Sequence, residues 1–145
     1  MRIVAIVQTR MGSTRLQKKV LMTAVGKTFI ELLMERIKHS KYIQEVIIAT
    51  TTNPRDDVLF NFCTEKKIPV FRGSENDVLD RHYQTAKAFN ADLIVRITSD
   101  CPLIDMHVVD NVIDTFLNGK YDYVSNIAPP TYPDGLDVYI FSFKA

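Results

Sequence analysis

The sequence predicts an α/β fold of three layers, in which a mostly parallel sheet lies between helices. Two observations lead to this fold class. Short apolar runs rich in β-branched residues alternate with amphipathic segments of helical length along nearly the whole chain. Several of the amphipathic segments also begin with a residue suited to cap a helix. Because repeated β–α alternation brings parallel strands together, the pattern indicates a sheet covered on both faces.

The first half of the chain supplies two strand–helix units. The apolar runs "RIVAIV" and "EVIIAT" predict buried strands at 2–7 and 45–50. The segment "TFIELLMERIKH" predicts a helix in which Thr28 and Glu31 have the spacing of a capping box. The segment "NPRDDVLFNFCTEKK" predicts another, with Asn53 as N-cap and a proline at the first helical position. We expect its buried face to consist of Val58, Leu59, Phe62 and Cys63.

The second half continues the alternation. "IPVF" and "DLIVRI" predict strands, separated by a helix that begins at Asn76 or Asp77 and runs to about Asn90. Asp105 is placed to cap a further helix, which Gly119 would end. "YDYVSN" and "LDVYIFSF" predict two more strands. The inward face of the last helix would be formed by Val108, Val109, Val112, Ile113 and Phe116.

Length and composition indicate one domain over residues 1–145. The chain has 145 residues, of which 46% are hydrophobic and 24% charged, as expected for a globular domain. Its final strand-like run, "VYIFSFKA", has no following segment to cover it. We therefore expect a domain whose C-terminal part lies beyond this sequence. An exposed final strand would also favour association into a homodimer.

Charge and hydropathy exclude several classes of partner. The net charge of +1 argues against a general nucleic-acid or membrane surface. The aromatic residues do not interleave with a basic patch, which argues against binding of single-stranded nucleic acid. No stretch approaches the roughly 18 apolar residues of a membrane span, and no signal peptide opens the sequence. We expect a cytoplasmic protein.

Polar segments follow each of the first four predicted strands of the sheet. They read "QTRMGSTRLQKK", "TTTNP", "RGSENDVLDR" and "TSDCPLID". The carboxyl ends of parallel strands meet at one edge, where open α/β sheets bind ligands. Residues 8–28 carry five basic side chains and no acid, which leaves 13 basic and 17 acidic residues elsewhere, a net charge of −4. A local cationic segment on a mildly acidic body indicates a compact anionic ligand.

The loop after the first strand has the residue types of a phosphate site. Gly12 and Ser13 would allow backbone N–H groups to approach phosphate oxygens. Arg10, Arg15 and Lys19 would neutralise their charge. The simpler alternative is a solvated basic loop. Two named phosphate motifs are absent, because the chain has no G-x-G-x-x-G and its "GKT" lacks the first glycine of a P-loop.

Asp100 is the acid that the pattern singles out. It follows "LIVRITS" at the predicted end of a central strand, where a carboxylate is costly unless it is hydrogen-bonded or metal-bound. Mg²⁺ binds through one or two carboxylates together with substrate phosphates, which suits a single acid facing a basic loop. The alternative is an Asx turn before the Cys101–Pro102 pair.

The sequence offers no nucleophile–base pair. Cys63 and Cys101 lie in apolar surroundings and form no C-x-x-C, which argues against zinc or a disulfide framework. Each of His39, His82 and His107 falls at or within a helical segment, so surface positions or satisfied packing are expected. Covalent catalysis is therefore not indicated.

At these strand-end segments the chain resembles the cytidylyltransferase family. Within it, the resemblance is to the spore coat polysaccharide biosynthesis branch, near the acylneuraminate- and Kdo-activating enzymes. The stretches "ATTTNPRDD", "VFRGSENDVLDR", "RITSDCPLID" and "YPDGLDV" also match this branch in order, so the resemblance spans nearly the whole chain. The first family motif, roughly Q-x-R-x-G-S-x-R-L-P-x-K, is matched at Gln8, Arg10, Gly12, Ser13, Arg15, Leu16 and Lys19.

The resemblance implies a Rossmann-like nucleotide-diphospho-sugar transferase fold and an enzyme that uses CTP and Mg²⁺. The product would be a CMP-sugar, with release of pyrophosphate. The residues implied to hold the CTP phosphates are Arg10, Arg15 and Lys19, as the catalytic set, with Gln8, Gly12 and Ser13. The residues implied to lie near the base are Ala49, Thr50, Thr51, Arg72, Gly73 and Asp77. Asp100 would be the Mg²⁺ ligand, and Asp134 and Asp137 would border the sugar pocket.

The chain departs from the family pattern at four positions. Gln17 and Lys18 stand where the family usually has Pro and Gly, and Ser99 replaces a common Gly before the aspartate. Tyr139 stands where this branch usually has an acid. Family members also continue well past residue 145. Their later segment supplies another acid near the metal, part of the sugar site and often the dimer contact.

Two other functions are compatible with the sequence. One is a nucleotide-binding module without turnover, which would bind CTP and release no pyrophosphate. The other is a glycosyltransferase that consumes a nucleotide sugar, since that class shares this kind of fold and metal use. A D-x-D metal motif would favour the latter, and the chain has none.

Overall fold

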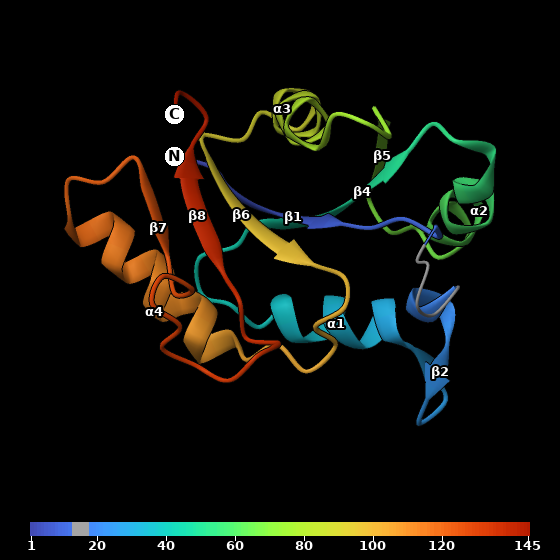
Figure 1. Cartoon of the computed structure of the whole chain (residues 1–145), viewed down its shortest axis with the longest axis horizontal. Helices are drawn as coiled ribbons and strands as arrows, with labels where there is room; N and C mark the ends of the chain where they lie inside the picture. Colours follow the sequence, from blue (N-terminus) through green and yellow to red (C-terminus); the bar gives the residue numbers. More distant parts are fainter. Residues whose placement is uncertain (13–17) are drawn as a thin grey trace.

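A six-stranded sheet forms the centre of the structure, with its strands in the order β5-β4-β1-β6-β8-β7 (Figure 1). The structure is a computed structural model, and it describes residues 1–12 and 18–145. A separate two-stranded ribbon pairs β2 with β3. The strands are β1 (Ile3–Gln8), β2 (Thr23–Ala24), β3 (Lys27–Thr28), β4 (Glu45–Thr51), β5 (Val70–Gly73), β6 (Leu93–Thr98), β7 (Tyr123–Ser125) and β8 (Tyr139–Ser142).

Helices cover both faces of the sheet, so the predicted three-layer α/β fold is confirmed. The helices α1, α2 and α4 contribute buried residues to one apolar cluster, and α3 contributes to the cluster on the opposite face. Figure 1 shows α1 and α4 below the sheet and α3 above it. No helix of the described ranges is both long and apolar enough to cross a membrane. The helices are α1 (Phe29–Ile37), α2 (Asp57–Glu65), α3 (Val78–Ala88) and α4 (Met106–Asn118), with short 3₁₀ turns η1 (Lys19–Leu21) and η2 (Pro54–Asp56).

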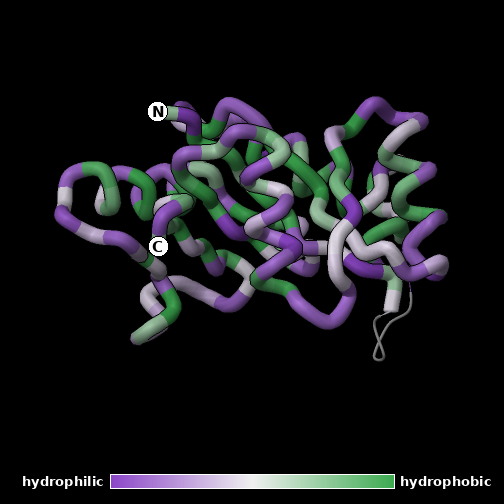
Figure 2. Tube along the Cα trace, turned by 90° about the horizontal axis from the view of Figure 1, so that it is seen from above, coloured by the Kyte–Doolittle hydropathy of each residue, from purple (hydrophilic) through white to green (hydrophobic). Residues whose placement is uncertain are grey.

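Burial on both faces explains why the first strand reads as a continuous apolar run. Within β1, Ala5 and Val7 point into the larger cluster, whereas Val4 and Ile6 point into the smaller one beneath α3. All four side chains are fully buried. Figure 2 shows the hydrophobic stretches of the trace along interior strands and helices, with hydrophilic stretches at many of the turns.

The parallel strands bring the predicted polar segments to one edge. β1 pairs in parallel with both β4 and β6, and β4 pairs in parallel with β5. The last residue of β1, Gln8, therefore lies between Ala49 of β4 and Thr98 of β6. The prediction that four polar strand ends share one edge of the sheet is confirmed.

The prediction of an exposed final strand is wrong. β8 lies inside the sheet, antiparallel to both β6 and β7. The outermost strand on this side of the sheet is β7. The chain returns from β7 through a loop that Asn126 holds, since its amide donates to the carbonyl of Leu136 and accepts from the N–H of Val138 at 2.8 and 2.9 Å. Both backbone edges of β8 are thus used within the sheet. Homodimer formation stays a prediction without this support.

The helix predicted from Asn53 differs in detail. Its first turn is the 3₁₀ turn η2, and α-helical geometry begins only at Asp57. Asn53 caps this turn by accepting from the N–H of Arg55 at 2.9 Å. Val58 is 47% exposed, contrary to expectation, because the buried stripe is centred on Leu59 and Cys63 and position 58 lies at its margin.

The capping box of α1 is confirmed. The Thr28 hydroxyl accepts from the N–H of Glu31 at 3.3 Å, and the Glu31 carboxylate accepts from the N–H of Thr28 at 2.9 Å. These contacts with Thr28 lower the pKa of the Glu31 carboxyl. Asp77 and Asp105 cap α3 and α4 in a similar way, by accepting from backbone N–H groups two or three residues ahead.

We expect Thr28→Ala to lower the free energy of unfolding by about 1 kcal/mol, because it leaves the N–H of Glu31 without its side-chain acceptor. Urea denaturation followed by circular dichroism measures the change. Thr52→Ala, at an exposed loop position, is the matched control and should change stability by less than about 0.5 kcal/mol. Equal losses in both variants would show that the box contributes nothing specific.

Candidate functional site

The candidate site lies at the carboxyl edge of the parallel strands. Gln8 ends β1, Thr51 ends β4, Gly73 ends β5 and Thr98 ends β6, all pointing the same way along the sheet. This is the edge at which open α/β sheets bind their ligands, because the loops that leave adjacent strands there separate to form a crevice.

The loop after β1 meets the end of β6 through one ion pair. The Lys19 ammonium lies 3.3 Å from an Asp100 carboxylate oxygen. Arg10 is exposed in the same loop, and a side chain added at Gly12 would meet no atom within 4 Å. The structure therefore brings a basic loop and an acid together as the sequence predicts. The predicted phosphate residues Ser13 and Arg15 lie outside the described residues.

Asp100 is held as an anion within reach of solvent. Its side chain is 47% exposed. The Thr98 hydroxyl does most to lower the pKa of the Asp100 carboxyl, and the Lys19 ammonium adds to this effect against the opposing effect of partial burial. A charged carboxylate that is partly open to solvent can exchange a lysine partner for another cation. Asp100 thus has the properties required of a metal ligand.

Asp56 joins the loop after β1 to the end of β4. The side chain is 2% exposed. One carboxylate oxygen accepts from the N–H of Met11 at 2.7 Å. The other accepts from the N–H of Thr51 at 3.2 Å and from the Thr51 hydroxyl. A single buried carboxylate therefore fixes where the basic loop begins relative to the sheet.

Of the residues predicted near the base, those at the end of β4 are buried, and Arg72 forms hydrogen bonds and an ion pair within the protein. Ala49, Thr50 and Thr51 are fully buried at the end of β4, and the Thr50 hydroxyl has no hydrogen-bond partner in the described part of the chain. Arg72 donates to the carbonyls of Thr51 and Asn53 at 2.8 and 3.1 Å. Its guanidinium also pairs with Asp57 at 2.7 Å. In this structure Arg72 ties β5 to the segment after β4.

Gly73 permits close packing of α3 on the sheet. A Cβ atom at this position would lie 2.9 Å from Cγ and 3.3 Å from Cα of Arg81. Arg81 is 1% exposed and donates to the carbonyl of Ser74 at 2.7 Å. Asp77 caps the same helix, accepting from the N–H of Asp80 at 2.8 Å. Both predicted base-side residues thus have a structural role here, and their ligand roles stay predictions.

The acids of the chain's tail lie near Cys101, the residue after Asp100. Burial raises the pKa of the Cys101 thiol, and the charges of Asp100, Asp137 and Asp134 contribute in the same direction. Among the residues described, no group of three or more His, Cys, Asp or Glu side chains is arranged to hold a metal ion. A metal ion at this edge would therefore need ligands beyond the described side chains.

Neither thiol of the chain has the properties of a nucleophile. Burial raises the pKa of the Cys63 thiol to about 12, and the Cys101 thiol is also buried and raised. His39 and His107 are exposed, as expected for surface positions. His82 differs, because it is buried and its Nε2 atom has no partner in the described part of the chain.

Three residues of the site edge were not predicted from the sequence: Asp56, Arg81 and Arg96. Asp56 follows a helix-capping Asn-Pro pair, and an acid in the first turn of a helix is too common to signal a buried acceptor. Arg81 and Arg96 lie within a helix and a strand, where pattern alone does not distinguish a buried arginine from a solvated one. Contacts with distant segments decide the roles of Asp56 and Arg96, and the packing of α3 on the end of β5 decides that of Arg81.

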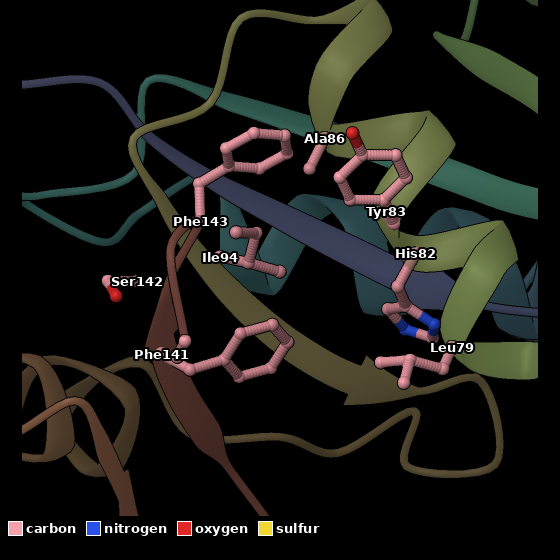
Figure 3. A pocket seen from close by; sticks show the side chains of 9 residues that line it. Leu79, His82, Tyr83, Ala86, Ile94, Phe141, Ser142 and Phe143 are labelled. Atoms are coloured by element: carbon pink, nitrogen blue, oxygen red, sulfur yellow. The ribbon is translucent and has the colours of Figure 1, made fainter.

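An apolar groove lies between α3 and β8. Figure 3 shows Leu79, His82 and Tyr83 of α3 facing Phe141 and Phe143 of the C-terminal segment. The rings of Tyr83 and Phe143 stack with their centroids 5.3 Å apart. β6 forms the floor of the groove, which leads toward the carboxyl end of that strand.

Comparisons with known proteins identify a family. The model of the family described as cytidylyltransferase matches residues 4–133. The chain is 41% identical over 147 aligned positions to an uncharacterized protein of Methanocaldococcus jannaschii, covering all of this chain and 58% of that protein. It is 35% identical to the spore coat polysaccharide biosynthesis protein SpsF of Bacillus subtilis, covering 88% of this chain and 55% of that protein. The chain thus spans somewhat over half the length of these relatives.

Solved structures agree on the fold. A cytidylyltransferase from Leptospira borgpetersenii superposes with a TM-score of 0.92 at 36% identity, over 99% of this chain and 61% of that one. A CMP:2-keto-3-deoxy-manno-octonic acid synthetase complexed with CTP superposes with a TM-score of 0.73 at 17% identity, over 99% of this chain and 75% of that one. The second likeness concerns the fold alone. The predicted Rossmann-like nucleotidyltransferase fold is confirmed.

We expect Asp56→Ala to lower the free energy of unfolding by about 3 kcal/mol or more, because three buried donors lose their acceptor. Urea denaturation measures the change. Asp57→Ala, the neighbouring acid, removes only a partly exposed pair with Arg72 and should cost less than about 1 kcal/mol. If the two variants were equally stable, the role assigned to the Asp56 carboxylate would be wrong.

Proposed function

Because this chain belongs to the cytidylyltransferase family, we propose that it binds CTP with Mg²⁺ and takes part in transfer of CMP to a sugar. Pyrophosphate would be the second product. The observation that carries this proposal is the Lys19–Asp100 pair, which joins the basic loop after β1 to the acid after β6 at the ligand-binding edge of the sheet. A triphosphate and its metal ion need these two charges side by side.

The residues present fit a Mg²⁺ ion shared with a nucleotide. Asp100 is anionic and accessible, and Lys19 is held to it by one ion pair that phosphate oxygens can replace. Mg²⁺ commonly keeps several waters and binds through one or two carboxylates plus substrate phosphates. When bound, the ion would supply charge neutralisation at the phosphate oxygens. We propose Asp100 as its ligand from this chain.

The basic side chains of this protein would supply most of the remaining stabilisation of the transition state. In the proposed reaction the sugar hydroxyl attacks the α-phosphorus of CTP and releases its proton to solvent, and the bond from that phosphorus to the departing pyrophosphate breaks. Arg10, Arg15 and Lys19 would bind the phosphate oxygens on which negative charge develops. Little covalent chemistry falls to the protein, so positioning and electrostatic stabilisation dominate.

The class of sugar is proposed from the relatives. A 3-deoxy-manno-octulosonate cytidylyltransferase of Trichlorobacter lovleyi is 31% identical over 118 residues, covering 81% of this chain and 46% of that protein. Together with the likeness to SpsF, this supports a sugar acid as acceptor and a role in surface polysaccharide biosynthesis. Asp134 and Asp137, close to Cys101, are the proposed border of the sugar pocket. We place the reaction in the cytoplasm.

A second candidate is CTP binding without turnover. It is favoured by one observation, that the chain spans 55–61% of the first relatives and of the Leptospira structure. Residues needed for the sugar or the metal can lie in the part that the alignment leaves out. Pyrophosphate release distinguishes this candidate from the first. The glycosyltransferase alternative gains no support, since the family match is to cytidylyltransferases and the sequence has no D-x-D.

We expect calorimetry to show tighter binding of CTP than of UTP, ATP or GTP, with Mg²⁺ strengthening the interaction. Asp100→Asn should weaken CTP binding about tenfold in Mg²⁺ and much less without it, since the carboxylate acts through the ion. Asp122→Asn is the control, because this exposed acid precedes β7 at the opposite edge of the sheet. An unchanged Mg²⁺ effect in Asp100→Asn would remove Asp100 from the metal site.

We expect Arg15→Ala to lower the rate of pyrophosphate release by roughly 10²–10³ in a longer version of the chain that is active, by analogy with loss of one oxyanion donor. The measurement is a coupled pyrophosphate assay with CTP and 3-deoxy-manno-octulosonate. A rate equal to that of the parent protein would show that Arg15 does not contact the reacting phosphates.

We expect the difference in CTP affinity between the parent protein and Asp100→Asn to stay constant from about pH 8 down to about pH 5. The reason is that the pKa of Asp100 lies below its ordinary value, so the carboxylate remains charged across this range. The contribution should disappear only as the pH falls through the lowered pKa. Calorimetry at several pH values tests this, and a difference that fades near neutral pH would contradict it.

A further inference from the structure

Arg96 places a positive charge near the carboxyl end of β6. It lies on β6, two residues before the end of that strand, and is partly buried. Its guanidinium donates from Nε and Nη2 to the side-chain oxygen of Gln8 at 3.3 and 3.1 Å. It also lies 4.6 Å from the ring centroid of Tyr139. Both partners are neutral.

No carboxylate in residues 1–12 or 18–145 forms an ion pair with Arg96, and residues 13–17 contain no acid. Arg2 and Arg72, by contrast, pair with acids at 2.5 and 2.7 Å. Partial burial of an arginine without an anion is costly, and a cation–π contact offsets only part of that cost. The guanidinium therefore retains capacity for an anionic partner.

Tyr139 is the cross-strand neighbour of Arg96. The register of the antiparallel β6–β8 pair sets Tyr139 directly opposite Arg96. Directly opposed residues on one face of a sheet are close enough to form an opposite-charge pair, and a tyrosine supplies no negative charge for one. With tyrosine there, the ring covers one side of the guanidinium and its charge stays uncompensated.

His82 lies near both Arg96 and a second arginine, Arg81. Burial does most to lower the pKa of His82, and the charges of Arg96 and Arg81 add to this effect, so His82 faces them as a neutral ring. Its Nε2 atom is buried without a partner in the described part of the chain. Figure 3 shows this ring at the end of the groove that lies toward the tip of β6. Gln8 continues the path into the loop after β1.

We propose that Arg96, with Gln8 and Tyr139 around it, is an anion subsite that receives a negatively charged group of the acceptor sugar. The inference rests on the proposed function and goes further, since it names the residue that selects an acidic acceptor. Arg96 is four residues before Asp100 on the same strand and loop, so an anion bound there lies on the β6 side of the site. The basic loop with Lys19 remains free for the triphosphate.

The test is calorimetry on the protein saturated with Mg²⁺ and α,β-methylene-CTP, an analogue that cannot react. The probes are 3-deoxy-manno-octulosonate, N-acetylneuraminate and the methyl ester of each acid, which lacks only the carboxylate charge. We expect the parent protein to bind at least one acid more tightly than its ester. Arg96→Gln should weaken binding of that acid by roughly 10- to 100-fold and leave the ester nearly unaffected.

Two further variants isolate the charge. Arg96→Lys keeps the positive charge and should retain part of the preference for the acid. Tyr139→Glu places a carboxylate opposite Arg96 and should abolish the preference, whereas Tyr139→Gln, of similar size and neutral, should retain it. The CTP affinity of each variant, measured without sugar, reports on the proposed nucleotide site independently.

The outcomes separate the two proposals. Failure of the protein to bind CTP would overturn the proposed function and the subsite with it. Normal CTP binding with no acid bound, or with acids and esters bound equally by the parent protein and Arg96→Gln, would overturn the subsite alone. Loss of acid binding in Tyr139→Gln as severe as in Tyr139→Glu would also overturn it, because shape and not charge would then be responsible.

Discussion

The carboxylate of Asp56 is the constraint on which the candidate site depends. It accepts from the backbone of Met11 in the loop after β1 and from the backbone and hydroxyl of Thr51 at the end of β4. Met11 and Val20 also anchor this segment, because both side chains are buried in the larger apolar cluster. Apolar packing has little directional preference, whereas a buried acceptor with three donors fixes the position of the backbone.

The charged groups of the site lie in the loop that Asp56 positions and at the end of β6. The loop leaves Met11, and when the described chain resumes, Lys19 lies against Asp100 after β6. Thr98 and Lys19 lower the pKa of Asp100, so this edge carries an accessible carboxylate facing a cationic loop. The proposed ligand, a nucleotide with its metal ion, would suit this arrangement, because Mg²⁺ commonly binds through one or two carboxylates together with substrate phosphates. The arrangement agrees with membership of the cytidylyltransferase family.

The antiparallel pairing of β8 with β6 determines which side chains face Arg96 and α3. By entering the sheet between β6 and β7, it sets Tyr139 opposite Arg96 and brings Phe141 and Phe143 to face α3. A parallel strand at this place would have required a crossover and would have set different residues beside Arg96. The register of β8 thus sets a neutral side chain opposite the charge of Arg96.

The sequence by itself determined the α/β class, the order of the principal elements and the edge at which the site lies. Periodicity and capping residues such as Thr28 and Asp105 act within a few residues, so their consequences can be read locally. The roles of Asp56 and Arg96, and the interior place of β8, were decided only by the tertiary structure. The physical reason is that buried polar partners and strand register depend on contacts between segments tens of residues apart, which no local pattern encodes.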